Sequence, residues 1–258
     1  MRRNGTFLAA AMVCLLAAGG AVAQTEKKEA PGAAIRPMEL YSCDYVEGKG
    51  LADLQQVAAK FNAWMDSTGQ QNYWAFLLMP YFRSSEQDFD VLWAGGWKNG
   101  ADMAVEIQRY VEAGGAVAAE FDKVVRCDTT TNFAIMDLSK APSPPDSGPV
   151  TFTNCTVKEG RKFADALAAV HGWIAYQKEH GIEEDNFLLF PAFGEKSDAK
   201  YSFKWVTTST WAAFGKSYDQ YGTGAGWMKA DELFDGLLDC DSGRVYVSQR
   251  LRSLPKAK

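Results

Sequence analysis

The chain has 258 residues, with 27 Lys and Arg against 32 Asp and Glu, and a formal net charge of −5. Because 47% of its residues are hydrophobic and 13% are aromatic, it can bury one or two hydrophobic cores. This composition excludes a disordered tail and a basic nucleic-acid-binding protein, so we expect no nucleic-acid partner.

The first 23 residues have the pattern of a secretory signal peptide. Arg2 and Arg3 precede an apolar run from Phe7 to Ala18, and Ala21-Val22-Ala23 offers the small-x-small pattern of a cleavage site. The apolar run is shorter than the ~20 residues that a membrane span needs. We therefore expect an exported protein, periplasmic or secreted, with no transmembrane anchor and with a polar leader over residues 24–37.

Four cysteines follow the expected signal peptide, namely Cys43, Cys127, Cys155 and Cys240. An even number in an oxidising compartment favours two disulfides over free thiols. No two of them have the close spacing of a zinc site, and the C-x-x-C-H motif of c-type haem attachment is absent from the sequence. We therefore predict no metal site.

The second half of the chain repeats the first at an offset of 111 to 113 residues. Between the copies lies a proline-rich segment, 139–149, which predicts an extended linker. The matched pairs are Cys43 with Cys155, Pro80 with Pro191, Trp93 with Trp205, Tyr110 with Tyr221, and Cys127 with Cys240.

Each copy has the same order of predicted elements. In the first copy a strand over 38–46 precedes an amphipathic helix over 51–66, in which apolar residues recur every three to four positions. A hairpin over 73–82 and 89–94, a helical region over 101–125 interrupted by Gly114-Gly115, and a strand over 133–138 complete it. This β-α-β-β-α-β order is that of the ferredoxin-like unit. We predict an α+β protein with two tandem ferredoxin-like units, at 38–138 and 150–253.

The expected topology also predicts how the cysteines pair. In a ferredoxin-like unit the last strand lies beside the first, so the end of strand one is near the start of strand four. Cys43 and Cys127 occupy these positions in the first copy, and Cys155 and Cys240 occupy them in the second. We therefore predict the disulfides Cys43–Cys127 and Cys155–Cys240.

Two such units in one chain resemble the dimeric α+β barrel superfamily, in which paired ferredoxin-like units join their sheets into a barrel. The resemblance rests on the element order, the duplication and the aromatic third strands, 89–93 and 201–205. The chain also resembles exported bacterial proteins of unknown function that have the same Cys-to-Cys repeat. The resemblance implies a pseudo-dimeric α+β barrel, a fold that occurs in cofactor-free monooxygenases, haem enzymes, isomerases and proteins without known activity.

The third strands suggest an aromatic pocket, although a packed core is the simpler interpretation. Alternation places Trp93 and Trp205 on one face of each strand and Asp90 and Lys204 on the other. Our main expectation is an exported, non-catalytic binding or interaction protein without a cofactor, whose pocket takes a small apolar or aromatic ligand. We also consider an envelope protein as its partner. The candidate ligand-binding residues are Trp93, Trp97, Trp205, Trp211, Tyr81, Phe193, Asp90 and Lys204, with Trp97, Trp211, Tyr81 and Phe193 at the mouth.

The alternative expectation is an enzyme of the barrel superfamily, either haem-dependent or a cofactor-free oxidoreductase. His171 lies inside the predicted helix 163–177, where a boundary or core histidine is the simpler interpretation. The superfamily resemblance implies that His171 is the axial ligand if haem binds. No sequence motif identifies other catalytic residues.

Overall fold

The computed structural model describes residues 35–85, 87–142, 145–196 and 199–254. The expected signal peptide and nearly all of the polar leader lie outside these residues. The first half of the chain contains β1 (Ile35–Tyr45), α1 (Leu51–Ser67), β2 (Tyr73–Phe82), β3 (Val91–Trp97), α2 (Gly100–Ala113), α3 (Gly115–Phe121) and β4 (Val125–Ser139). The second half contains β5 (Ser147–Val157), α4 (Phe163–Glu179), β6 (Asp185–Phe193), β7 (Phe203–Thr208), α5 (Trp211–Gly222), α6 (Gly226–Phe234), β8 (Leu238–Cys240) and β9 (Arg244–Arg252).

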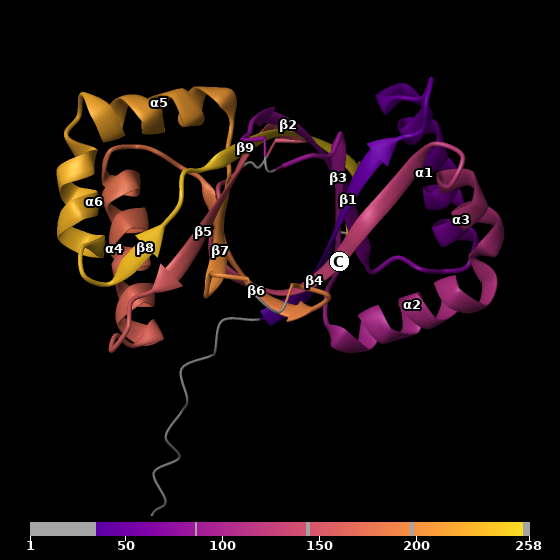
Figure 1. Ribbon diagram of the computed structural model, residues 1–258, viewed down its shortest axis with the longest axis horizontal. Coiled ribbons are helices and arrows are strands. Elements are labelled where there is room, and N and C mark those ends of the chain that lie inside the picture. Colours follow the sequence, from indigo (N-terminus) through magenta and orange to yellow (C-terminus); the bar gives the residue numbers. More distant parts are fainter. Residues whose placement is uncertain (1–34, 86, 143–144, 197–198, 255–258) are drawn as a thin grey trace, which may run out of the picture. The chain divides into compact units, whose positions relative to one another are not determined.

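The strands form a closed barrel. In the first half they lie in the order β4-β1-β3-β2, and in the second half in the order β9-β5-β7-β6. Antiparallel pairing of β4 with β6 and of β2 with β9 joins the halves at both edges. Figure 1 shows the resulting ring, with α1 to α3 on one side of it and α4 to α6 on the other. The predicted α+β barrel is therefore confirmed.

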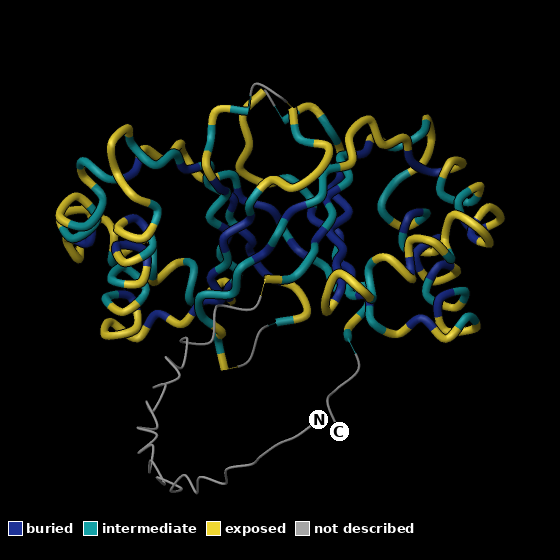
Figure 2. Tube along the Cα trace, turned by 90° about the horizontal axis from the view of Figure 1, so that it is seen from below, coloured by how far each residue is buried: buried dark blue, intermediate teal, exposed yellow. Residues whose placement is uncertain are grey.

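Alternation along the strands separates the barrel interior from two helix-covered cores. On β1, Met38 and Leu40 belong to the cluster inside the barrel, whereas Tyr41 and Cys43 belong to the cluster under α1 to α3. A third cluster lies between the second half of the sheet and its helices. In Figure 2 the buried residues accordingly concentrate in the central strands between the two groups of helices.

Helix α1 shows why the first core forms where the sequence predicts it. Its buried residues, Leu54, Val57, Ala58, Phe61 and Met65, recur at helical spacing and pack against the sheet. The helix begins after Gly50, whose N–H donates to the Asp53 carboxylate (3.2 Å). Shortly after its end the chain turns at Gly69, where φ is +73°.

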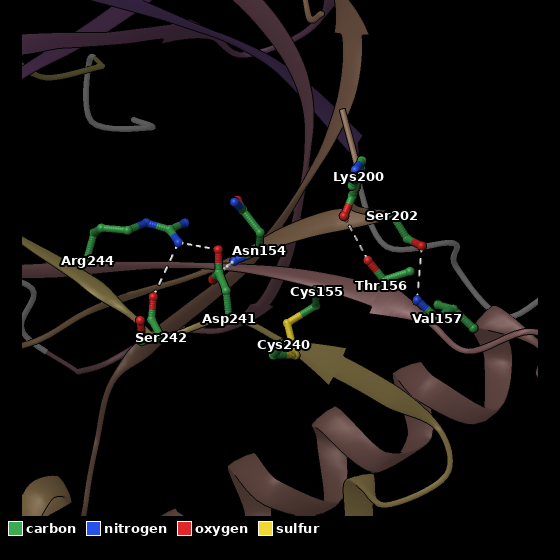
Figure 3. Close-up of a disulfide and its surroundings, with 10 residues drawn as sticks. All are labelled: Asn154, Cys155, Thr156, Val157, Lys200, Ser202, Cys240, Asp241, Ser242 and Arg244. Atoms are coloured by element: carbon green, nitrogen blue, oxygen red, sulfur yellow. Dashed lines mark hydrogen bonds and ion pairs between the residues drawn. A yellow bond between two sulfur atoms is a disulfide. The ribbon is translucent and has the colours of Figure 1, made fainter. Parts of the chain in front are cut away.

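Both predicted disulfides are present in the structure. Cys43 bonds to Cys127 and Cys155 bonds to Cys240, and each pair is directly opposite across neighbouring antiparallel strands. Figure 3 shows the second bridge beside Asp241, whose carboxylate accepts a hydrogen bond from the backbone N–H of Asn154 (2.7 Å). The first bridge therefore joins β1 to β4, and the second joins β5 to the short strand β8.

Several element boundaries differ from those expected from the sequence. Residues 35–37 and 147–149, assigned to the leader and the linker, belong to β1 and β5, because antiparallel pairing with β4 and β9 continues through them. β4 begins at Val125 rather than at 133, since its β-branched threonines pair with β1. The helical region after β3 is two helices separated at Gly114. Among the described residues, no helix is long and apolar enough to cross a bilayer.

Candidate active site

A cavity of about 1030 Å³ lies between β1, β3 and the helices of the first half. Its walls are mostly apolar and aromatic, because they are the helix-facing residues of the first core. The Phe61 ring meets Trp93 and Tyr73 edge-on, with centroids 5.7 and 5.9 Å away, and Trp93 meets Phe121 at 5.4 Å. A site of this size and lining suits a small flat apolar molecule.

A chain of hydrogen bonds crosses the sheet at one wall of the cavity and ends on Glu39. The Trp93 indole N–H donates to the Tyr73 hydroxyl (2.7 Å), which donates to Oε1 of Glu39 (2.8 Å). The Tyr41 hydroxyl donates to Oε2 of the same carboxylate (3.1 Å). All four residues line the cavity. Glu39 is thus held by two tyrosines.

Glycine at position 95 makes this arrangement possible. Gly95 on β3 pairs with Glu39 on β1, and Tyr73 reaches across from β2. A Cβ at Gly95 would lie 1.8 Å from the Tyr73 hydroxyl oxygen, so any larger residue would displace the tyrosine from the carboxylate. The sequence therefore places Tyr73, Gly95 and Glu39 on three adjacent strands as one unit.

The surroundings of Glu39 change its acidity. Burial raises the pKa of Glu39 to about 7, and the hydrogen bonds from Tyr73 and Tyr41 oppose this effect. Burial also raises the pKa of Tyr73 and of Tyr41, so both remain neutral donors at physiological pH. A carboxylate with a pKa near 7 that faces an aromatic cavity can accept a proton from a bound molecule.

A second group of polar side chains lines the same cavity. Glu106 on α2 accepts a hydrogen bond from the backbone N–H of Asn72 (3.1 Å), and burial raises its pKa. Gln70 and Trp97 also line the cavity, and each is only 3% exposed. The cavity therefore combines apolar walls with two distinct polar regions.

The opening of the cavity is bordered by exposed apolar side chains. Ile107, Tyr110 and Val111 on α2 line it, as does Phe193 from the end of β6 in the second half. Val111 and Phe193 are the most exposed of these, at 77% and 70%. An apolar molecule can therefore meet apolar contacts before it enters.

The residues expected from the sequence to bind a ligand do not form one site. Trp93, Trp97 and Phe193 line the cavity, but Trp97 is buried rather than at its mouth. Tyr81 and Trp211 are exposed and contact each other elsewhere, with ring centroids 6.3 Å apart.

The remaining three have structural partners of their own. Trp205 packs on Phe234 in the second core, and its N–H donates to the Asn186 side-chain oxygen (3.0 Å). Asp90 accepts a hydrogen bond from the Tyr45 N–H (2.9 Å). Lys204 lies on the opposite face of β7 and donates to Asn154 (3.0 Å), and burial lowers its pKa to about 8.

Sequence reasoning missed the polar residues of these two regions of the cavity, Glu39, Tyr41, Tyr73, Gln70 and Glu106. A signal was present for Glu39, which interrupts a strand of otherwise apolar and aromatic residues over 38–41. A carboxylate at a helix-facing position of such a strand is costly unless it has a role or partners. The partners came from other strands, so their proximity was not visible in the sequence.

Haem ligation by His171 does not fit the structure. His171 is on the exposed side of α4, whereas the side facing the sheet presents Ala166, Ala169 and Val170. Fully buried Phe203 and Leu188 fill the space under these residues. Among the described residues that line the first-half cavity there is no histidine. Neither half therefore offers this histidine to a buried haem.

Comparison with known proteins identifies the fold. No protein-family model and no curated protein matches the sequence. A candidate monooxygenase from Fusobacterium nucleatum subsp. nucleatum superposes with a TM-score of 0.54 at 9% identity, covering 86% of this chain and 95% of that one. A mutant chlorite dismutase from Candidatus Nitrospira defluvii superposes with a TM-score of 0.52 at 5% identity, covering 84% and 92%.

These neighbours correct the main functional expectation from the sequence. Both are described as enzymes, which favours the alternative, an enzyme of this fold, over a non-catalytic binding protein. Identities of 5% and 9% identify the fold and do not identify a reaction. From its closed barrel and these neighbours, the protein has the dimeric α+β barrel fold.

Proposed function

We propose that this protein is a cofactor-independent oxidoreductase that uses Glu39 as a general base on a flat aromatic substrate. The observation that carries the proposal is the Glu39 carboxylate, which has a pKa of about 7 and is held between two tyrosine hydroxyls in the wall of an aromatic cavity. The similarity to a candidate monooxygenase fold supports this class of reaction.

The cavity selects the class of substrate. Phe61, Trp93 and Phe121 offer ring faces and edges to a planar molecule. A general base with a pKa near 7 acts best on a proton that is itself weakly acidic. An aromatic ketone with an activated methylene group between two rings meets both requirements.

The reaction can be balanced with molecular oxygen as the only oxidant. Glu39 removes one proton from the methylene carbon, and the resulting carbanion forms a bond to O₂ at that carbon. The proton on Glu39 then passes to the distal peroxide oxygen. Glu39 then removes the second C–H proton while the O–O bond breaks, and the departing hydroxide takes that proton from Glu39, which leaves a carbonyl group and releases water. Methylene and O₂ thus give carbonyl and water, with the substrate supplying all four electrons.

Tyr73 and Tyr41 act by positioning the base. Each donates one hydrogen bond to a different oxygen of Glu39, so the carboxylate plane is fixed. Trp93 orients Tyr73 by donating to its oxygen. This preorganisation keeps Glu39 in place before the substrate enters.

Oxygen uptake by the purified full-length protein tests the proposal. The probe is a tricyclic aromatic ketone with a central methylene group. We expect one O₂ consumed per quinone formed, without added cofactor, and a loss of about 100-fold or more in Glu39→Gln. The matched control is Glu184→Gln, because Glu184 is also buried with a pKa of about 7 and lies outside the residues that line the cavity. Equal rates in wild type and Glu39→Gln, or no uptake by wild type, would refute the proposal.

We also propose that the two halves, one from β1 to β4 and the other from β5 to β9, are tandem ferredoxin-like units, and that the protein is exported. The repeated strand order supports the first point. The two disulfides and the signal-peptide pattern support the second. Secretion assays should recover a mature protein that begins at Gln24, and an intact N-terminus in the cytoplasm would contradict export.

A further inference from the structure

The second polar region of the cavity contains side-chain atoms that lack hydrogen-bond partners. Within the described residues, eight buried side-chain nitrogen or oxygen atoms are unpaired. Four of them belong to three residues of this cavity: both amide atoms of Gln70, the indole nitrogen of Trp97 and Oε2 of Glu106. The Trp97 side chain lies near enough to Glu106 to lower the pKa of that carboxyl, but the two groups do not meet in hydrogen-bond geometry. These residues are 3%, 3% and 6% exposed. Such groups are rare in folded proteins, because an unpaired buried polar atom loses its bonds to water without replacement.

Rigid neighbours hold these three residues in place. The Gln70 backbone N–H donates to the Met65 carbonyl (2.9 Å), and its carbonyl accepts from Arg252 (2.7 Å). Glu106 is fixed through its other oxygen by the Asn72 N–H. Trp97 ends β3 and packs on the Tyr73 ring, with centroids 5.2 Å apart. The Gln70 backbone, one carboxylate oxygen of Glu106 and the Trp97 ring are therefore held in place without ligand.

We propose that Gln70, Trp97 and Glu106 bind a second polar group of the substrate, a neutral hydroxyl or carbonyl remote from the group that reacts at Glu39. This inference rests on the proposed function, since it places both groups on one substrate. It narrows the substrate class to planar aromatic compounds that carry oxygen substituents at two ends.

The hydrogen-bond donors and acceptors of these three residues favour a neutral hydroxyl or carbonyl group over an anionic one. Trp97 offers one donor, the Gln70 amide offers donors and an acceptor, and the free oxygen of Glu106 is an acceptor when the group is ionised. A hydroxyl can donate and accept within this set, and a carbonyl can accept from Trp97 and Gln70. An anionic group would lie beside the Glu106 carboxylate, which disfavours it.

The spacing between the two polar regions fits a fused ring system. Glu39 pairs with Gly95 on β3, and Trp97 lies two residues further along the same strand. With a rise of about 3.3 Å per residue, these strand positions are about 7 Å apart. A rigid planar molecule can therefore span the two regions without bending.

Calorimetric titration under nitrogen tests the inference in the absence of turnover. The probes are 2-naphthol and 2,6-dihydroxynaphthalene, which differ only in the distal hydroxyl. We expect the diol to bind the full-length protein about tenfold more tightly, because it pairs groups that are otherwise unsatisfied. Trp97→Phe and Gln70→Leu should each reduce this ratio toward one. Two variants are used so that a folding defect in one leaves the other informative.

Trp74→Phe is the matched control. The Trp74 indole nitrogen is also buried and unpaired within the described part of the chain, but Trp74 lines a separate cavity of about 420 Å³ inside the barrel. The Trp74→Phe variant should preserve the tenfold ratio between the affinities for the two probes. Equal affinities for the two probes in wild type, or binding of neither probe, would overturn the inference. It would also be overturned if Trp74→Phe lowered the affinity ratio as much as Trp97→Phe and Gln70→Leu do.

The outcome is distinguishable from failure of the proposed reaction. A tenfold ratio without oxygen uptake would refute only the oxidoreductase proposal. Oxygen uptake that depends on Glu39, together with equal affinities for the two probes, would refute only the second binding region.

Discussion

The Tyr73 hydroxyl oxygen lies where a side chain at Gly95 would begin, 1.8 Å from the position of a Cβ on that glycine. This contact links the backbone of β3 to the hydrogen bond that Tyr73 donates to Glu39. It also means that the candidate base depends on a residue without a side chain.

Gly95→Ala should therefore destabilise the protein and disable the site. The new methyl group must displace Tyr73, which breaks its bonds to Trp93 and Glu39, so we expect a loss of about 2 kcal/mol or more in the free energy of unfolding. Urea denaturation measures it. Gly215→Ala on α5 is the control, because nothing lies within 4 Å of a Cβ there. Equal stability of the two variants would contradict the proposed packing.

Stability should fall as pH rises from about 4.5 to 7. Glu39 has a pKa of about 7 in the folded protein against an ordinary pKa of 4.5, so the unfolded chain releases its proton first. The folded state thus loses up to about 3 kcal/mol relative to the unfolded state across this window, and the penalty is constant above it. Glu184 has a similar pKa and adds a second contribution.

Glu39→Gln should flatten this pH dependence without abolishing it, since Glu184 remains. The free energy of unfolding, measured in urea at pH 4.5 and at pH 8, gives the difference for each protein. An identical difference in wild type and Glu39→Gln would show that Glu39 does not titrate with a raised pKa.

The rate of oxygen uptake should rise with pH through a midpoint near 7, because only ionised Glu39 accepts a proton. Tyr73→Phe removes a hydrogen bond that lowers the pKa of Glu39, so the midpoint should move to higher pH. Tyr201→Phe is the control, since Tyr201 donates to Glu195, a residue that does not line the cavity. The pH profile of kcat/KM measures both. A midpoint that stays fixed or moves down in Tyr73→Phe would contradict the role of Tyr73.

The two disulfides should have similar effects on stability and different effects on binding. Replacing either pair by alanine should cost about 2–5 kcal/mol in the free energy of unfolding. Only Cys43 and Cys127 line the cavity, so their loss should also raise KM. Kinetics and denaturation of both double variants provide the comparison. An equal rise in KM in both double variants would show that the change in binding comes from the loss of global stability.

His171→Ala should change neither stability nor oxygen uptake. The side chain is exposed, and a surface substitution away from other features costs less than about 0.5 kcal/mol. A large loss of activity in this variant would restore the haem alternative.

The sequence predicted the parts of the fold that depend on pattern. Helical spacing identified α1, strand alternation separated the faces of β3, and the expected ferredoxin-like topology identified the disulfide pairs. Closure of the barrel depends on β4 with β6 and β2 with β9, pairs of strands that the sequence pattern does not relate. The element order suggested this closure only because it resembles that of the dimeric α+β barrel superfamily.

The site was harder to predict because matched residues have different neighbours. Trp93 and Trp205 are equivalent in the repeat, yet one donates to Tyr73 and the other to Asn186. At the position of Val91 in the first half, the second half has Phe203, a larger side chain that is fully buried. The size difference helps to leave a cavity on one side of the barrel and a packed core on the other.

The residue that corresponds to Gly95 in the second half is Thr207, which pairs with Thr151 as Gly95 pairs with Glu39. A homodimer would impose one residue on both equivalent positions and so give both subunits the same site. A single polypeptide can have different residues at the two equivalent positions. One half can therefore form a cavity while the other forms a packed core. We therefore expect a binding stoichiometry of one ligand per barrel rather than two.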